Sequence, residues 1–330
     1  MNDVARVAGV SHQTVSRVLN DHPSVRPETA DRVRAAIAQL GYRRNTAARA
    51  LVTSRSGMIG LVTASGPSFG PTSTLLAVEQ AAREAGYFVS MVSMPNLTPE
   101  STPRAMEHFL SQGVEGVVVI APMTDVHSVL SPYAEQVPVV TIAAGVPAGQ
   151  AFHPVSVDQR LGARQATRHL LELGHRDIVH IAGPGDWLDA RERIIGWREE
   201  LANAGIDPSG LLVDAGAWES RRGYEVGRRM AKDGLPSAVF TSNDQLALGF
   251  IRAAVDHGAS VPGDVSVIGF DDIEGADCFL PPLTTMRQEF RQLGQRSIAM
   301  LLDAMEGLEL DHTPIAPRLI VRASTGPARA

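Results

Sequence analysis

The 330-residue sequence holds a single cysteine, Cys278, so no internal disulfide can form. This scarcity suits a reducing cytoplasm, and a lone cysteine more often packs as a small apolar group than acts as a nucleophile. No run of about 18 apolar residues occurs, which excludes a membrane-spanning helix. The sequence also begins without a charged and then apolar leader. We therefore expect a cytoplasmic protein that contacts no membrane.

Two kinds of chemical site have no support in the sequence. No His-x-x-x-His segment and no cysteine pair has the spacing of metal ligands, so we predict no metal and no cofactor. The segment Gly183-Pro-Gly185 is not followed by the Lys-Ser/Thr of a phosphate-binding loop. Nucleotide hydrolysis is therefore unsupported.

The segment Gly66-Pro-Ser-Phe-Gly70 matches the G-x-S-x-G pattern of a hydrolase nucleophile elbow. It follows a predicted strand and precedes a predicted helix, as that motif requires. However, the strand is the first of its lobe, and no His-Gly-Gly-Gly segment lies upstream. Asp271 and His312 can be nominated as partners of Ser68, but only because acids and histidines are plentiful. We prefer a simple turn and a protein that is not an enzyme, and we keep a serine hydrolase as a remote alternative.

Charge is distributed unevenly along the chain. Residues 1–56 hold nine arginines and four acidic residues, a net charge of +5; the whole chain carries −6, so the remainder carries −11. A basic head on an acidic body indicates nucleic-acid contact by the head. The length suggests two or three units of about 100–150 residues each. A content of 44% hydrophobic and 20% charged residues is that of an ordinary globular protein.

The most informative stretch covers residues 3–20 and predicts two short helices joined by a tight turn. Gly9 lies between them, where a left-handed backbone favours glycine, and Ser11 is placed to cap the second helix. Two helices joined in this way form a helix-turn-helix, whose second helix enters the DNA major groove. The apolar residues at helical spacing are Val4, Val7 and Ala8, then Val15, Val18 and Leu19.

The second of these helices leaves His12, Gln13, Ser16 and Arg17 outside its apolar face. All four side chains can hydrogen-bond to base edges or phosphates, and Arg and Gln are the better readers of guanine and adenine. An ordinary amphipathic hairpin remains the alternative, because short motifs also match by chance.

A third helix is predicted to begin at Pro27, because proline at the first position and an acidic first turn favour a helix start. Gly41 ends it, and its apolar stripe consists of Val33, Ile37 and Leu40. Residues 43–53 follow and are rich in helix formers, but an isolated helix below about 12–15 residues is marginal in water. We predict that this segment orders only when it docks onto something; a plain linker is the alternative.

From Met58 onward, strand and helix patterns alternate. Repeated βα units with near-continuous apolar strands imply parallel sheets covered on both faces, and right-handed crossovers would build two such lobes. The predicted strands cover residues 58–63, 87–93, 116–120, 138–142, 177–182, 211–214, 238–242 and 265–270. The predicted helices include residues 72–85, 162–173, 191–204 and 245–257.

Polar residues follow several of these strands, at the carboxyl ends where open α/β sheets bind ligands. Carboxylates accept hydroxyl hydrogen bonds, Arg and Asn donate, and an aromatic face stacks on C–H surface. The mixture suits a neutral polyhydroxylated ligand, although Asp244 and Asp272 taken singly read as helix N-caps. The set consists of Arg191, Arg193, Asn243, Asp244, Asp271 and Asp272, with the aromatic residues Trp218 and Phe290.

Residues 3–20 match the DNA-binding signature of the lactose-repressor (LacI/GalR-type) family of bacterial transcription regulators, and the chain resembles this family over essentially its whole length. Residues 190–197, 242–249 and 281–294 carry the resemblance further along the chain. It implies an α/β fold class with three parts: a three-helix helix-turn-helix headpiece, a hinge helix, and a two-lobed sensor that is similar to periplasmic binding proteins and has parallel sheets.

By position, the resemblance also implies DNA contacts. Residues 45–52 would form the hinge helix, and Leu51 would be an apolar wedge inserted at the operator centre from each subunit of a dimer. The expected partner is a double-stranded, pseudo-palindromic operator. The implied base readers are His12, Gln13 and Arg17, with Ser16 beside them; Ser11, Thr14 and Asn20 would lie near phosphates, and Asn45, Ala48 and Leu51 would contact DNA from the hinge.

In the sensor, the resemblance implies that Arg193, Asn243 and Asp271 hold sugar hydroxyl groups and that Trp218, Gln288 and Phe290 line the cleft. The effector would be a sugar or glycoside; the same architecture responding to a non-sugar ligand or co-repressor is the alternative. A periplasmic-type solute-binding protein would share the lobes, but it would need a leader peptide and would lack residues 1–53.

Three positions depart from the family pattern. Met1 falls where further residues, including the cap of the first helix, are usual, so a phosphate contact is missing or the start is misplaced. Arg44 stands where a proline usually precedes the hinge. Ala143 replaces an aspartate found in the sugar site of the family's type member, which weakens the case for a galactoside. The sequence ends at Ala330 without a leucine-heptad tail, so we expect a homodimer.

The predicted domain boundaries follow from these patterns. The headpiece would cover residues 1–44, and the hinge helix with its linker residues 45–57. The amino-terminal sensor lobe would combine residues 58–156 and 288–316. The carboxy-terminal lobe would combine residues 157–287 and 317–330.

Overall fold

The structure is a computed structural model that describes residues 1–19, 22–42, 55–64, 68–94, 101–120, 126–146 and 152–329. The chain divides into two compact units, Met1–Ser56 and Gly57–Ala330, and each is described by itself. Asn20 and the predicted hinge residues Asn45, Ala48 and Leu51 lie outside the described residues.

Three helices form the first unit: α1 (Asn2–Ala8), α2 (His12–Leu19) and α3 (Pro27–Leu40). Gly9 follows α1 in the left-handed conformation with φ 62°. Ser11 Oγ accepts the Thr14 N–H at 3.1 Å at the start of α2. Gly41 ends α3 with φ 57°. The predicted turn, cap and helix end are therefore confirmed, and the fold is the predicted helix-turn-helix.

The small core of this unit is narrower than the apolar pattern suggested. Val4, Val15 and Val33 are almost completely buried, whereas Val7 and Leu40 are 44% and 42% exposed. Three short helices that meet on one another bury only a thin stripe each, so an apolar residue slightly further around the helix faces solvent. Alanines complete the core instead, namely Ala5, Ala8, Ala30 and Ala36.

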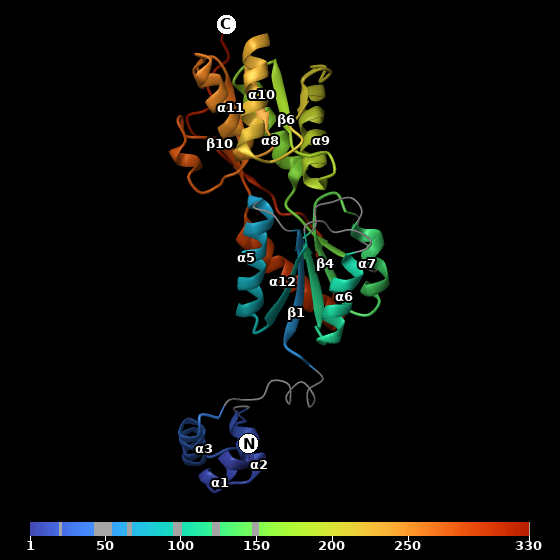
Figure 1. The fold of residues 1–330 in the computed structure, drawn as a ribbon, viewed down its shortest axis with the longest axis vertical. Helices are drawn as coiled ribbons and strands as arrows, with labels where there is room; N and C mark the ends of the chain where they lie inside the picture. Colours follow the sequence, from blue (N-terminus) through green and yellow to red (C-terminus); the bar gives the residue numbers. More distant parts are fainter. Residues whose placement is uncertain are drawn as a thin grey trace. The chain divides into compact units, whose positions relative to one another are not determined.

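The amino-terminal lobe of the second unit contains a five-stranded parallel sheet in the order β2-β1-β3-β4-β5. Helices α5 (Phe69–Glu84) and α12 (Phe290–Glu306) pack beside each other on one face, and α6 (Thr102–Ser111) and α7 (Val126–Ala134) cover the other (Figure 1). The strands are β1 (Met58–Ala64), β2 (Phe88–Met94), β3 (Gly116–Ile120), β4 (Val139–Ile142) and β5 (His153–Val155).

The carboxy-terminal lobe has a six-stranded sheet in the order β11-β10-β9-β8-β6-β7, in which only β11 runs antiparallel to its described neighbour. Helices α8 (Gln159–Glu172) and α9 (Leu188–Asn203) pack on one face, and α10 (Ser220–Asp233) and α11 (Asp244–Asp256) on the other. The strands are β6 (Ile178–Ala182), β7 (Leu212–Asp214), β8 (Ala238–Thr241), β9 (Ser266–Asp271), β10 (Thr284–Arg287) and β11 (Arg318–Ile320).

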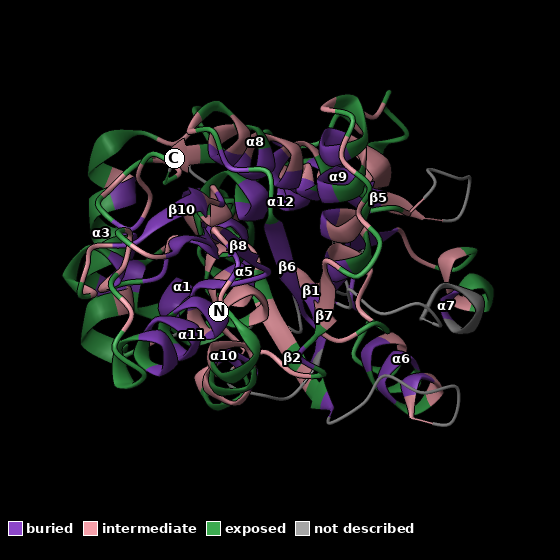
Figure 2. Cartoon of the chain, turned by 90° about the horizontal axis from the view of Figure 1, so that it is seen from above, coloured by how far each residue is buried: buried purple, intermediate pink, exposed green. Residues whose placement is uncertain are grey.

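Burial follows this layered arrangement. The central strands β3, β4, β6, β8 and β9 are buried along their whole length, because helices cover both faces of each sheet. Figure 2 shows the buried class on the strands and on the inward sides of the helices. This is the doubly covered parallel arrangement that the continuous apolar strands predicted.

The chain passes between the two lobes three times: after β5, after β10, and between α12 and β11. The first and third crossings lie side by side, because Val157 pairs with Ile315 in a parallel bridge. The Asp158 N–H donates to the Ile315 carbonyl and the Ile315 N–H to the Ser156 carbonyl, both at 2.8 Å. These crossings connect the lobes at the edge of the space between them.

The predicted alternation of strands and helices is confirmed, and the strand ends agree to within one or two residues. Sequence patterns missed β5, β10 and β11, which have three or four residues each and carry His, Pro, Thr or Arg in place of an apolar run. A 3-10 helix, η1 (Ala276–Cys278), was also not anticipated. Within the described residues, every helix is too short or too polar to cross a membrane.

Candidate functional site

A cleft lies between the two lobes at the carboxyl ends of both parallel sheets, which is where open α/β sheets bind ligands. All six residues that the sequence assigned to the ligand site line this cleft: Arg193, Trp218, Asn243, Asp271, Gln288 and Phe290. The sequence therefore placed these residues together correctly, while their contact with a ligand stays a prediction.

Arg193 projects from α9 into the buried floor of the cleft and is 3% exposed. Its Nε–H donates to Gln159 Oε1 at 2.9 Å, and Nη1 donates to the Ser242 carbonyl. The guanidinium carbon lies 3.9 Å from the centroid of the Phe270 ring. Burial lowers the pKa of Arg193, and nearby carboxylates oppose this effect; a guanidinium nevertheless stays charged at neutral pH. The cleft thus contains one positively charged donor in a fixed orientation.

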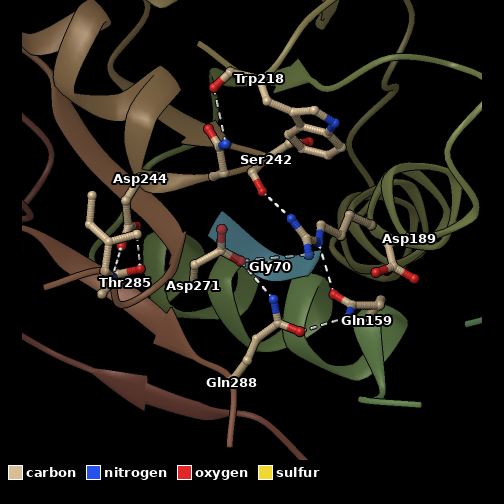
Figure 3. A network of polar contacts seen from close by, with 12 residues as sticks. Gly70, Gln159, Asp189, Trp218, Ser242, Asp244, Asp271, Thr285 and Gln288 are labelled. Atoms are coloured by element: carbon tan, nitrogen blue, oxygen red, sulfur yellow. Dashed lines mark hydrogen bonds and ion pairs between the residues drawn. The ribbon is translucent and has the colours of Figure 1, made fainter. Parts of the chain in front are cut away.

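A chain of side-chain hydrogen bonds connects Arg193 to Asp271 (Figure 3). Gln159, which accepts from Arg193, donates its Nε2–H to Gln288 Oε1 at 2.8 Å, and Gln288 Nε2–H donates to Asp271 Oδ1 at 2.6 Å. The direct distance from Arg193 Nη2 to Asp271 Oδ1 is 3.8 Å, longer than a hydrogen bond. Because Gln159 and Gln288 follow two of the crossings, this chain ties the cleft to the segments that join the lobes.

Asp271 is the last residue of β9 and has a φ of 108°, and Asp272 follows with a φ of 55°. Positive φ values are uncommon for residues other than glycine and cluster at functional sites. Burial raises the pKa of Asp271 to about 6, although Arg193 and Gln288 both act to lower it. The strained turn therefore presents, at the cleft floor, a carboxylate whose pKa is raised to about 6.

The predicted cap at Asp244 is wrong. Asn243 caps α11 instead, and its Oδ1 accepts the Leu246 N–H at 2.8 Å. Asp244 is fully buried, where its carboxylate accepts the Thr285 Oγ–H at 2.5 Å and the Ile273 N–H at 2.8 Å. Burial is the main cause that raises the pKa of Asp244 well above its ordinary value. Asp244 thus holds the turn that follows β9 rather than a helix end.

Asp272 is not a helix cap either. Its carboxylate forms ion pairs with Arg287 and Arg322, the latter at 2.7 Å between Nη2 and Oδ1. The nearest helix, η1, begins after Gly275. The prediction failed because Arg287 at the end of β10 and Arg322, which follows β11, pair with this carboxylate.

Aromatic side chains supply flat apolar surface on both sides of the cleft. The rings of Trp187 and Trp218 meet edge to face with centroids 5.2 Å apart, and those of Phe69 and Phe290 do so at 5.7 Å. Such faces stack well on the C–H surface of a sugar ring. Trp218 Nε1 is buried and has no hydrogen-bond partner among the described residues, which leaves an unsatisfied donor on a residue that lines the cleft.

Gln159, Trp187 and Asp189 are among the cleft residues that the sequence patterns missed. Trp187 and Asp189 follow β6, in a segment that was weighed only as a phosphate-binding loop. Their position after a strand was the signal that could have found them. Arg191, which was included for that reason, does not line the cleft; it is exposed and donates to the Gly185 carbonyl at 2.6 Å.

The structure does not assemble a hydrolase triad from the nominated residues. Ser68 precedes α5 and lines the cleft together with Asp271. His312, in contrast, donates from Nδ1 to the Pro154 carbonyl at 3.2 Å and stacks against His153, away from the cleft lining. His312, the nominated base, therefore does not reach Ser68 in the arrangement that nucleophilic catalysis requires.

In the first unit, α2 presents a polar surface opposite its buried valines. Ser11, His12, Gln13 and Arg17 are exposed, and Thr14 and Ser16 are partly exposed. Their side chains are thus accessible in the way that base and phosphate contacts require. Among the residues that the structure describes, no group of three or more His, Cys, Asp or Glu side chains is arranged to hold a metal ion.

Comparison with known proteins identifies the class of this chain. Residues 1–45 match the model of the bacterial regulatory proteins of the lacI family, and residues 167–325 match the periplasmic binding protein-like domain. The chain therefore belongs to the lacI family, a family of DNA-binding transcription regulators.

Several transcription regulators are similar to this chain over nearly its whole length. The chain is 33% identical to the lactose operon repressor of Escherichia coli (strain K12), covering 98% of this chain and 89% of that protein. It is 34% identical to the HTH-type transcriptional repressor PurR of Haemophilus influenzae (strain PittEE), covering 98% of both. Among solved structures, the lac repressor dimer bound to operator and the anti-inducer ONPF gives a TM-score of 0.88 at 33% identity, with 98% of both chains covered. A complex of the transcriptional regulator CelR with cellobiose gives 0.73 at 31%, again with 98% of both chains covered.

Proposed function

We propose that this protein is a transcriptional repressor that binds operator DNA through its first unit and is controlled by a neutral sugar or glycoside bound in the cleft. The observation that carries the proposal is the pairing of an exposed polar reading face on α2 with a cleft that combines carboxylates, one guanidinium and aromatic faces. It is not an enzyme on this account, in keeping with relatives that are regulators.

The DNA contacts divide into two kinds. Arg17, Gln13 and His12 are proposed to read base edges, because their side chains are exposed on α2 and can match the donor and acceptor pattern of the major groove. Ser11 and Thr14 are proposed to contact phosphates, which position the helix without specifying sequence. Ser16 lies between these two sets, and Asn20 would extend the phosphate contacts.

The chemistry of the cleft favours a neutral polyhydroxylated ligand. Asp271 accepts hydroxyl hydrogen bonds, Arg193 and Trp218 donate, and Trp218 and Phe290 offer faces for stacking. A solved relative, CelR, is described in complex with cellobiose, which supports a sugar. A non-sugar effector or co-repressor remains the second candidate, and a sugar screen separates the two.

We propose that the protein acts as a homodimer on a near-palindromic operator, since a two-fold dimer reads two half-sites. Exposed apolar residues support a subunit interface: Leu248 and Val255 are seven residues apart on α11 and therefore share a face, and Leu280 is 87% exposed. Residues 45–52 would act as the hinge helix, with Asn45, Ala48 and Leu51 in contact with DNA. The site of action would be the cytoplasm, where bacterial DNA lies.

Control of DNA binding follows from the two-lobed arrangement. A ligand shifts an equilibrium between two lobe arrangements only by its differential affinity for them. The chain of hydrogen bonds from Arg193 to Asp271 includes Gln159 and Gln288, which lie at the crossings between the lobes. A ligand that binds Arg193 or Asp271 would therefore affect the segments that connect the lobes. We propose that ligand binding changes the lobe arrangement, undocks the hinge helices and lowers operator affinity.

The test has two arms that use the purified full chain. Selection from random duplexes should yield a near-palindromic sequence, and a thermal-shift screen of cellobiose, lactose, isopropyl thiogalactoside and a purine base should find a stabilising sugar. A ligand at 100 times its dissociation constant adds about 2.7 kcal/mol of stability. Recovery of no preferred sequence would remove the DNA-binding claim, and stabilisation by the purine alone would remove the sugar.

A further inference from the structure

The charged residues that line the cleft all come from the carboxy-terminal lobe. They are Asp189 and Arg193 on α9 and Asp271 at the end of β9. The facing wall of the amino-terminal lobe includes Ile142, Ala143 and Ala144, whose side chains offer no acceptor. Among the described residues, any carboxylate that meets a ligand near that wall therefore reaches across from the opposite lobe.

The side chain of Asp189 extends across the cleft in this way. Its Oδ1 accepts the Ala144 N–H at 3.1 Å, a hydrogen bond that joins the two lobes across the cleft. The close approach continues at Gly145, where a methyl group would meet the Glu192 carboxylate. The second carboxylate oxygen of Asp189 has no hydrogen-bond partner within the part of the chain that the structure describes. One oxygen is thus fixed by the opposite backbone while the other remains available in the cleft.

The charges in the cleft determine which ligands that available oxygen of Asp189 favours. Asp189 and Asp271 share the guanidinium of Arg193, since burial lowers the pKa of that group and the negative charge of each carboxylate acts to raise it. Burial raises the pKa of Asp189, and Arg193 and the Ala144 N–H partly oppose this rise. Two desolvated carboxylates with a single cation need hydrogen-bond donors, and they disfavour a ligand that brings a further negative charge.

We propose that Asp189 is a specificity-determining residue of the ligand site: a carboxylate supplied by the carboxy-terminal lobe, positioned by the Ala144 N–H, that accepts a ligand hydroxyl at the amino-terminal wall. It takes this role because residue 143 is alanine and because, among the described residues, the amino-terminal lobe contributes the hydroxyl groups of Ser68 and Thr74 but no carboxylate to the cleft lining. The inference rests on the proposed function in that it assumes a neutral polyhydroxylated ligand. It adds that ligand recognition and lobe closure use the same carboxylate.

The first experiment measures ligand binding by the full chain. Wild type, Asp189→Asn and the matched control Glu192→Gln are titrated calorimetrically with cellobiose, lactose and isopropyl thiogalactoside. Asn keeps the shape of the Asp189 side chain but loses its charge. Each sugar that binds wild type should therefore bind Asp189→Asn at least tenfold more weakly. Glu192 lies outside the cleft lining, so affinity for the Glu192→Gln control should differ from wild type by less than twofold. Binding by Asp189→Asn within twofold of wild type would overturn the inference.

The second experiment needs no ligand, so it separates this inference from the proposed function. Hydrogen exchange at the Ala144 amide is compared in wild type, Asp189→Ala and Glu192→Gln. Loss of the acceptor should speed exchange at Ala144 at least tenfold in Asp189→Ala, while the control stays near wild type. Unchanged exchange in Asp189→Ala would overturn the positioning claim. If wild type binds none of the sugars, the proposed effector class fails while this exchange result still decides the role of Asp189.

Discussion

At the scale of single residues, the cleft is organised by charges that are buried and only partly compensated. Arg193 is 3% exposed and Asp271 is 7% exposed, yet their closest polar atoms are 3.8 Å apart. Gln159 and Gln288 bridge this gap through neutral amides. Burying a carboxylate costs free energy unless hydrogen-bond donors surround it. A hydroxylated ligand that donates to Asp271 would supply donors that the protein itself does not fully provide.

This arrangement makes the ligand response sensitive to pH. Burial raises the pKa of Asp271 to about 6, so its acceptor form is lost as the pH falls through that value. The sugar-induced release of operator should therefore weaken as the pH falls from 7.5 to 5, because a protonated carboxyl has lost its charge and is a weaker acceptor of hydroxyl hydrogen bonds. Fluorescence anisotropy of labelled operator measures this. Asp271→Asn is the control: its residual response should not vary over that range, and the same pH dependence in both proteins would contradict the assignment.

His180 gives a second prediction, which concerns stability. It is fully buried in β6, where Nδ1–H donates to the Phe240 carbonyl at 2.9 Å, and burial lowers its pKa to about 3 from 6.5. The unfolded state therefore binds the additional proton as pH falls below about 6.5, and stability contributed by the neutral ring is lost toward pH 3. From pH 8 to pH 5 this loss amounts to about 2 kcal/mol.

Urea unfolding followed by the fluorescence of Trp197, whose ring centroid lies 5.5 Å from that of His180, checks this prediction. His180→Leu should remove that part of the acid sensitivity. The raised pKa values of Asp244 and Asp271 act in the opposite direction and are common to both proteins, so the difference between wild type and variant isolates the histidine. Identical pH profiles would show that His180 is protonated in the folded state.

At the scale of elements, the sequence anticipated what local pattern and strand topology determine. Continuous apolar runs predicted the buried strands, and parallel pairing brought the residues after them to one edge, so Asn243 and Asp271 lie together as expected. Gln288 follows β10, which the patterns missed, and only the family resemblance assigned it to the site. Local pattern could not decide between Asn243 and Asp244 as the cap, because both residue types cap well. The choice depends on Thr285 and Ile273, which reach Asp244 from elements far along the chain.

The missed residues are missed for the same physical reason. Asp189 becomes a cleft residue through the Ala144 N–H, 45 positions earlier and in the other lobe. Gln159 gains its role by lying between Arg193 and Gln288. These contacts depend on how the two lobes face each other, which no window of neighbouring residues contains.

The packing of α10 on α11 yields a prediction for an element pair. Gly249 faces α10 so closely that an added Cβ would overlap the Ser220 carbonyl oxygen. Gly249→Ala should push the helices apart and lower the free energy of unfolding by about 1–3 kcal/mol. Gly185→Ala in the same lobe, where a Cβ meets no atom within 4 Å, should change stability by less than about 0.5 kcal/mol. Urea denaturation of both variants makes the comparison, and equal stabilities would contradict the described packing.

At the scale of the whole molecule, the part proposed to bind DNA and the part proposed to sense the ligand carry net charges of opposite sign. The first 56 residues carry +5 and the remainder −11, so attraction to DNA belongs to the headpiece. Each neutralised phosphate contributes a slope of about −0.9 to the plot of log affinity against log salt, and 6–10 contacts cost about a thousandfold or more between 50 and 200 mM salt. Operator affinity should fall this steeply. Arg221→Gln, on the acidic second unit, should leave the slope unchanged; a shallow wild-type slope would contradict a phosphate-based interface.

The central claim is that one unit reads DNA while the other senses a sugar, and that the two are coupled. The most direct test is one titration, in which anisotropy of the selected operator is followed as sugar is added to wild type, Arg17→Ala and Asp271→Ala. Arg17→Ala should lose discrimination between operator and random duplex yet keep the sugar-induced thermal shift. Asp271→Ala should bind operator normally and not release it. Wild-type discrimination by Arg17→Ala, or wild-type release by Asp271→Ala, would contradict the account.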